Sequence, residues 1–149
     1  MNGLYLCVFA LVSLLTACAT DSVQPRSAEA LNSAAVSHST LCGYKVPLML
    51  SPTDTASARQ YVGIYGPGTW SNGFCAALII ESVGETQASV IFVNDKGWER
   101  FQANLYGDKI QFLHNSCNVV YQVESLGYLK GTYYGNRTFE TSLSKRPLT

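Results

Sequence analysis

The stretch "NVVYQVESLGYLKGTYYGNRTFETSLSK", residues 118–145, decides the fold of this chain. Apolar and polar side chains alternate through it, and an alternation of period two places successive side chains on opposite faces of a strand. The stretch therefore predicts three strands that share one buried face and expose the other to water. The residues predicted on the buried face are Val119, Tyr121, Val123, Leu129, Gly131, Tyr133, Phe139, Thr141 and Leu143.

Turn signals divide the preceding residues in the same way. The segments "GET", "NDKG", "GD", "SLG" and "GNR" supply the Gly, Asn and Asp that tight hairpin turns need. No gap between the apolar segments is long enough for a crossover helix, so neighbouring strands should be antiparallel. The predicted strands cover residues 60–65, 74–83, 87–93, 98–106, 109–113, 118–124, 128–134 and 138–145.

These strands predict an all-β domain, an antiparallel up-and-down meander of about eight strands. Such a meander with one apolar face must curl to cover that face. A closed or nearly closed barrel does so and also removes the unpaired edges. A strongly bent sheet is the alternative.

Two short motifs suggest a family resemblance. The triplet "GTW", residues 68–70, precedes the first long predicted strand, and "LKGTYYG", residues 129–135, lies near the end. The pair resembles the pattern of calycins (lipocalins, fatty-acid-binding proteins and avidins), in which a Gly-x-Trp closes one end of the barrel. Residues 61–146 are also similar to small β-meander modules of secreted bacterial proteins. The resemblance implies an architecture, and a fold by itself does not assign a function.

The beginning of the chain predicts a targeting segment. Residues 1–17 carry no charged side chain, and their apolar run has the length of a signal-peptide core and is too short to span a bilayer. Leu15-Thr16-Ala17-Cys18 resembles the lipobox of bacterial lipoproteins, which implies lipid attachment at Cys18. An ordinary secretory signal is the alternative. Ala19 stands where an aspartate commonly retains lipoproteins at the inner membrane, so we expect an outer-membrane anchor that faces the periplasm.

Three further segments are predicted between this leader and the C-terminus. Residues 18–40 are rich in Ala, Ser and Thr and lack aromatic side chains, which predicts a disordered tether. Residues 41–58 are predicted to form a packed arm, with a short helix after Ser51-Pro52. Residues 59–146 form the predicted β-domain.

The cysteines of the mature chain predict one disulfide. Cys42, Cys75 and Cys117 would lie in a compartment that oxidises thiols. Cys75 lies at the start of the second predicted strand and Cys117 directly precedes the sixth, at the same end of the meander, which favours their pairing. Strands two and six lie across a closed barrel, however, and a disulfide needs Cα atoms within about 7 Å. Cys42 on the arm therefore remains the alternative partner.

Charge and motif content exclude several classes of function. Ten basic and ten acidic residues are scattered without a run of one sign, so we expect no nucleic-acid partner. The sequence shows no paired carboxylates, metal-ligand cluster or phosphate-binding loop. His114 in the turn "HNSCN" is interpreted as structural, because a Cys-His nucleophile also needs an orienting group and an oxyanion site. We therefore expect no catalytic residues, no metal and no other cofactor.

The aromatic side chains leave two interpretations open. They either fill the interior, as eight-stranded barrels permit, or line a cavity for an apolar or ring-shaped ligand. The filled interior is the favoured prediction. The main functional expectation is accordingly a non-catalytic envelope lipoprotein with a structural or protein-binding role. The alternatives are a carrier of a small apolar or aromatic ligand, and an accessory or inhibitor of an envelope enzyme. The ligand-lining candidates are Trp70, Trp98, Phe101, Tyr121, Tyr133 and Phe139.

Overall fold

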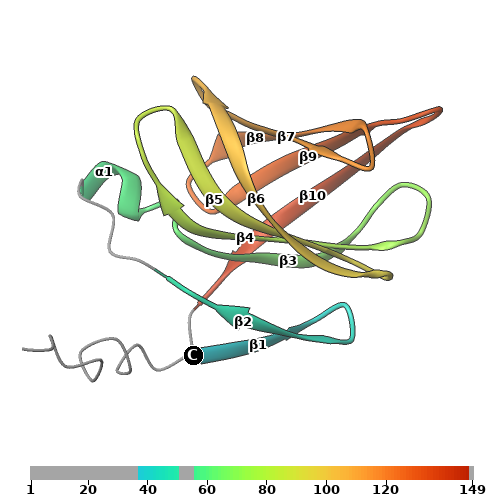
Figure 1. The fold of residues 1–149 in the computed structure, drawn as a ribbon, viewed down its shortest axis with the longest axis horizontal. Coiled ribbons are helices and arrows are strands. Elements are labelled where there is room, and N and C mark those ends of the chain that lie inside the picture. Colours follow the sequence, from blue (N-terminus) through green and yellow to red (C-terminus); the bar gives the residue numbers. More distant parts are fainter. Residues whose placement is uncertain (1–36, 51–55, 148–149) are drawn as a thin grey trace, which may run out of the picture. The chain divides into compact units, whose positions relative to one another are not determined.

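A computed structural model describes residues 37–50 and 56–147 of the chain. The predicted signal peptide and the predicted lipid site at Cys18 lie outside these residues. Within them, eight antiparallel strands close into a barrel in which each strand pairs with its neighbours in the chain (Figure 1). The barrel strands are β3 (Gly63–Thr69), β4 (Cys75–Val83), β5 (Gln87–Asn94), β6 (Gly97–Tyr106), β7 (Lys109–His114), β8 (Cys117–Ser125), β9 (Tyr128–Tyr134) and β10 (Thr138–Arg146). The prediction of an all-β meander closed into a barrel is confirmed.

The strand bounds agree with the prediction to within one residue from residue 74 onward. The first strand differs: β3 begins at Gly63, because the N–H groups of Tyr61 and Val62 donate to Ala58 and Arg59 in the turn after helix α1 (Ala56–Arg59). The strand continues to Thr69 through a register shift between Tyr65 and Gly68. The predicted helix start at residues 51–52 lies outside the described residues.

The barrel interior follows the alternation that the sequence shows. Val119, Tyr121, Leu129 and Leu143 are buried in one cluster with the inward side chains of β3 to β7. Gly131 faces the ring of Tyr121 across the pair β8–β9, and a Cβ at that position would lie 2.6 Å from Tyr121 Cε1. The absence of a side chain at residue 131 therefore leaves room for the Tyr121 ring.

A β-hairpin covers part of the outer wall. Strands β1 (Ser37–Leu41) and β2 (Tyr44–Leu48) pair with each other and lie against β3 and β4 (Figure 1). A second apolar cluster joins the hairpin to the outward side chains of β3, β4 and β5: Leu41, Val46, Leu48, Ile64, Ala77, Ile79, Ile91 and Val93. The expectation of one dry and one wet face is therefore wrong for these strands, which are buried on both sides.

The hairpin also corrects the predicted boundary of the tether. We expected a tether through residue 40, whereas β1 begins at Ser37 and places His38 opposite Pro47. Ser37, His38 and Thr40 remain exposed, so their polar composition resembles that of a linker. These residues are held by backbone pairing with β2, which does not depend on their side chains and so cannot be predicted from composition.

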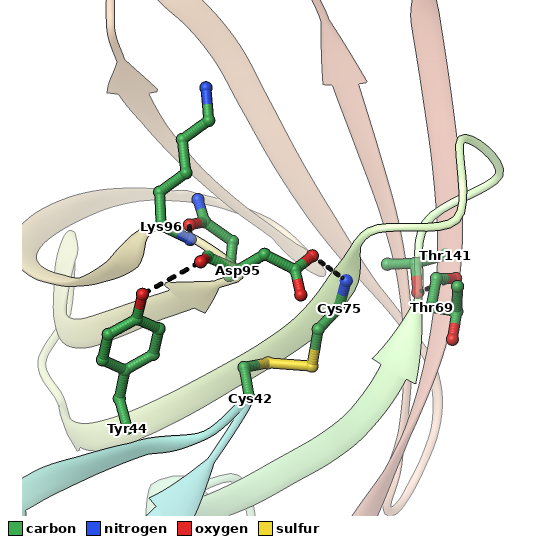
Figure 2. Close-up of a disulfide and its surroundings, with 8 residues drawn as sticks. Cys42, Tyr44, Thr69, Cys75, Asp95, Lys96 and Thr141 are labelled. Carbon is green, nitrogen blue, oxygen red and sulfur yellow. Dashed lines mark hydrogen bonds between the residues drawn. A yellow bond between two sulfur atoms is a disulfide. The ribbon is translucent and has the colours of Figure 1, made fainter.

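The disulfide joins Cys42 of the hairpin to Cys75 at the start of β4, with Cα atoms 5.7 Å apart (Figure 2). The favoured pairing of Cys75 with Cys117 is wrong, and the alternative partner Cys42 is the correct one. Cys117 is a free thiol at the start of β8. The physical reason is the closed barrel, in which β4 and β8 are separated by three strands on either side.

A buried carboxylate ties the hairpin to the barrel wall. Glu81 is only 2% exposed and lies at a register shift of β4, where its side chain points outward under the end of β2. Its oxygens accept hydrogen bonds from the Met49 N–H at 2.9 Å, the Ser89 hydroxyl at 3.1 Å, and Arg100 Nε and Nη2 at 2.8 and 3.1 Å. This ion pair and its hydrogen bonds raise the pKa of Arg100. Four donors from three segments thus satisfy one buried charge.

Candidate functional site

The barrel is hollow at one end. In an antiparallel meander alternate connections lie at the same end, so the connections at residues 70–74, 95–96 and 115–116 come together there. They surround a cavity of about 250 Å³, which we call the cup. The cup is lined by Trp70, Asn72, Phe74, Phe92, Asn94, Asp95, Lys96, His114, Asn115, Tyr133 and Phe139.

Trp70 forms the floor of the cup and is 5% exposed. Its ring centroid lies 6.1 Å from that of Tyr121, 6.3 Å from Phe92 and 6.2 Å from Tyr133. The loop that carries Trp70 is held by hydrogen bonds from the Trp70 N–H to the Phe74 carbonyl and from the Ser71 N–H to the Glu140 carbonyl. Tyr121 and the other side chains on the far side of Trp70 belong to the buried interior cluster, and the cup lies on the near side. Whether the cup holds an apolar ligand stays a prediction.

His114 lines the cup as a neutral imidazole. Asn115 Nδ2 lies 3.3 Å from its Nε2 and donates to it, which leaves the proton on Nδ1. Nδ1 lies 3.3 Å from the Tyr133 hydroxyl, which itself donates to the His114 carbonyl at 3.2 Å. Desolvation by burial lowers the pKa of His114, with Glu99 opposing and Lys96 reinforcing the shift. Both ring nitrogens thus have partners within the cup.

Tyr133 is the polar contact between the cup and the free thiol. Desolvation by burial and a hydrogen bond with Cys117 raise its pKa to about 12, so the phenol is protonated at neutral pH. A Cβ at Gly135 would lie 3.5 Å from Cys117 Sγ. Cys117 therefore lies behind Tyr133 and is not among the residues that line the cup.

The rim of the cup is polar. Asn72 Oδ1 accepts the Phe74 N–H at 3.2 Å, and Asn94 Oδ1 accepts the Lys96 N–H at 2.8 Å. Because the side-chain oxygen of each asparagine accepts a backbone N–H, the orientation of both side-chain amides is fixed. Their NH₂ groups remain available to other partners. Asp95 is held on two sides, because its carboxylate accepts the Cys75 N–H and its carbonyl accepts the Tyr44 hydroxyl (Figure 2). The disulfide, the hairpin and the rim are therefore connected.

The structure separates the six predicted ligand-lining residues into two groups. Trp70, Tyr133 and Phe139 line the cup. Trp98 lies on the outer wall, 39% exposed, with the Arg100 guanidinium 6.0 Å from its ring. Phe101 stacks on Phe112 at 4.6 Å inside the barrel. Tyr121 is fully buried beneath Trp70. These last three residues therefore do not line the cup.

Sequence reasoning missed most of the rim and one wall of the cup. The sequence places Asn94, Asp95, Lys96 and Asn115 only in turns, and none of the turns quoted above includes Asn72. The order of the predicted strands could have identified these residues as neighbours. Once the strands are assigned, every second turn must lie at the same end, so the polar residues of those turns must be neighbours.

The Tyr121 hydroxyl has no hydrogen-bond partner among the described residues, although the side chain is fully buried. Burial also raises the pKa of this phenol. A buried hydroxyl without a partner costs about 1–3 kcal/mol. Tyr121→Phe is therefore expected to raise the free energy of unfolding by about 1 kcal/mol, measured by urea denaturation.

The matched control for this variant is Tyr65→Phe. Tyr65 is equally buried, but its hydroxyl donates to the Tyr61 carbonyl at 2.9 Å. Its removal should lower the free energy of unfolding by about 1 kcal/mol. Equal losses of stability in the two variants would contradict the assignment of an unpaired hydroxyl at Tyr121.

Comparison with protein-family models, curated proteins and solved structures finds no match for this chain. The calycin resemblance therefore stays a prediction. Within residues 37–50 and 56–147, no helix has the length and apolar character needed to cross a bilayer. In the same residues, no three His, Cys, Asp or Glu side chains gather in a way that could hold a metal ion.

Proposed function

We propose that this protein is a lipid-anchored, extracytoplasmic binding protein whose cup takes a small, flat, apolar or aromatic ring. The cup supports this function because aromatic side chains form its floor and walls, its polar turn residues lie at the rim, and the polar atoms of His114 and Tyr133 are hydrogen-bonded to each other. That division is typical of small-molecule sites, where apolar area supplies affinity and a few polar groups supply orientation. Of the roles that the sequence leaves open, the ligand carrier is the one that a cavity of this chemistry favours.

The size of the cup limits the ligand. A cavity of about 250 Å³ lies just below the usual range for ligand pockets, which begins near 300 Å³. One ring or two fused rings therefore match it better than a long acyl chain. The tilted and edge-on contacts around Trp70 leave ring faces and edges for a further aromatic partner.

The proposed location rests on the leader and the disulfide. Cys18 would carry the fatty acyl chains, and Ala19 favours the outer membrane facing the periplasm. The disulfide between Cys42 and Cys75 supports an oxidising compartment. Cys18→Ser should move the protein from the membrane fraction to the soluble fraction, and a wild-type protein found wholly in the soluble fraction would contradict the anchor.

The ring-binding proposal is tested with 1-naphthalenemethanol, a neutral fused-ring probe, by titration calorimetry. The full chain is used in lipid nanodiscs, with empty nanodiscs as the blank for partitioning. We expect saturable binding of one probe per chain. In a Trp98→Phe background Trp70 is the sole tryptophan, so quenching of its fluorescence would place the probe in the cup.

Two variants distinguish the cup from other surfaces. Phe139→Ala removes part of the cup wall and should weaken binding about tenfold, because one aromatic contact with its buried area contributes roughly 1–2 kcal/mol. Tyr128→Ala removes an exposed ring outside the cup and should leave the affinity unchanged. The absence of saturable binding, or equal losses in the two variants, would refute the proposed function.

A further inference from the structure

The rim of the cup offers donors and one unpaired cation. The amide oxygens of Asn72 and Asn94 are occupied by backbone N–H groups, so these residues present their NH₂ groups. Lys96 Nζ has no ion-pair or hydrogen-bond partner among the described residues, and Figure 2 shows its side chain extended away from the Asp95 carboxylate. All three residues line the same cavity. The free polar groups of these three residues are therefore donors.

Two carboxylates, Asp95 and Glu99, lie near these donors. Asp95 uses a carboxylate oxygen to accept the Cys75 N–H and is directed toward it in Figure 2. Glu99 lies opposite Phe92 in the β5–β6 pair and opposes the lowering of the pKa of His114, but its side chain is exposed and is not among the residues that line the cup. His114 is uncharged at neutral pH because burial lowers its pKa. Lys96 is thus the cation that a bound molecule would meet.

Resting on the proposed ring-binding function, we propose that the ligand is a small aromatic carboxylic acid. Its ring lies on Trp70, and its carboxylate faces the Lys96 ammonium and the NH₂ groups of Asn72 and Asn94. A carboxylate has only acceptor sites, so it complements a rim of donors. Hydrogen bonds between charged partners are about twice as strong as neutral ones. The rim would therefore select acids among rings that the aromatic walls accept equally well.

The test compares three probes with the same fused ring and different charge: 1-naphthoate, 1-naphthalenemethanol and 1-naphthylmethylammonium. Affinities are measured by calorimetry on the full chain in nanodiscs of uncharged lipid at pH 7.5. We expect 1-naphthoate to bind about tenfold more tightly than the alcohol, and the ammonium probe to bind most weakly. High salt should reduce the preference for the acid, because the rim is exposed.

Lys96→Gln should bring the ratio of the carboxylate and alcohol affinities close to one. The matched control is Lys130→Gln, on the outer wall beside Glu140, which should retain the wild-type ratio. If none of the three probes binds, the proposed function itself fails. If the probes bind without a preference for the acid, or if Lys96→Gln retains that preference, only this inference fails. Preferred binding of the ammonium probe would assign Asp95 as the partner and overturn it as well.

Discussion

Replacing Glu81 by alanine is expected to lower the free energy of unfolding by about 3 kcal/mol, the lower end of the range for breaking a buried ion pair. Glu81 is 2% exposed and accepts hydrogen bonds from Met49, Ser89 and Arg100. Its removal leaves the Met49 N–H and the Ser89 hydroxyl without their acceptor. The loss stays near the lower end because the Arg100 side chain is 34% exposed and can be hydrated.

The matched control is Glu140→Ala. Glu140 pairs with Lys130 at 3.4 Å, but both side chains are about half exposed, at 58% and 45%. Surface pairs contribute roughly 0–1 kcal/mol, so urea denaturation should show little change for this variant. Similar effects of the two replacements would contradict the structural role assigned to Glu81. Hydrogen exchange at Met49 should also accelerate in Glu81→Ala alone, because only that variant frees the Met49 N–H.

Removing the disulfide is expected to cost about 3–4 kcal/mol in the double variant Cys42→Ala, Cys75→Ala. The two cysteines are 33 residues apart, and the bridge stabilises the fold because it reduces the conformational entropy of the unfolded chain. For a loop of this length, the chain-entropy model gives the stated free energy. Urea denaturation with and without reductant measures the effect. Wild-type protein should lose stability in reductant, whereas the double variant should not respond.

Cys117→Ala serves as the control, since Cys117 is a free thiol on β8 and takes no part in the bridge. It should cost less than about 1 kcal/mol and leave the response to reductant intact. Non-reducing peptide mapping of the wild type should recover Cys42 linked to Cys75. Recovery of Cys75 linked to Cys117 would overturn the pairing.

The disulfide variant should also bind 1-naphthalenemethanol more weakly than the wild type in the calorimetric test of the proposed function. The Cys75 N–H donates to the Asp95 carboxylate, and the Tyr44 hydroxyl of the hairpin donates to the Asp95 carbonyl at 2.9 Å (Figure 2). Loss of the bridge releases the hairpin that positions this part of the rim. The hairpin therefore has two roles, covering apolar wall and holding the turn that carries Lys96.

Local sequence patterns were sufficient to predict the positions of most barrel strands. From residue 74 onward, alternation and turn residues predict each strand to within one residue, because both signals depend on neighbours in the chain. The unbroken apolar runs at residues 76–80 and 90–93 also indicate strands that are buried on both faces. Strands buried on both faces lose their alternation, and these runs lie where the hairpin covers the barrel.

Period-two alternation between tight turns is enough to predict the all-β class, the meander order and the inward faces of β8, β9 and β10. It does not show that Cys42 is the partner of Cys75, that residues 37–48 form a covering hairpin, or that Trp70 and Lys96 share one cavity. These features depend on distances across the closed barrel between residues far apart in the chain. Local pattern contains no measure of such distances until the barrel has closed.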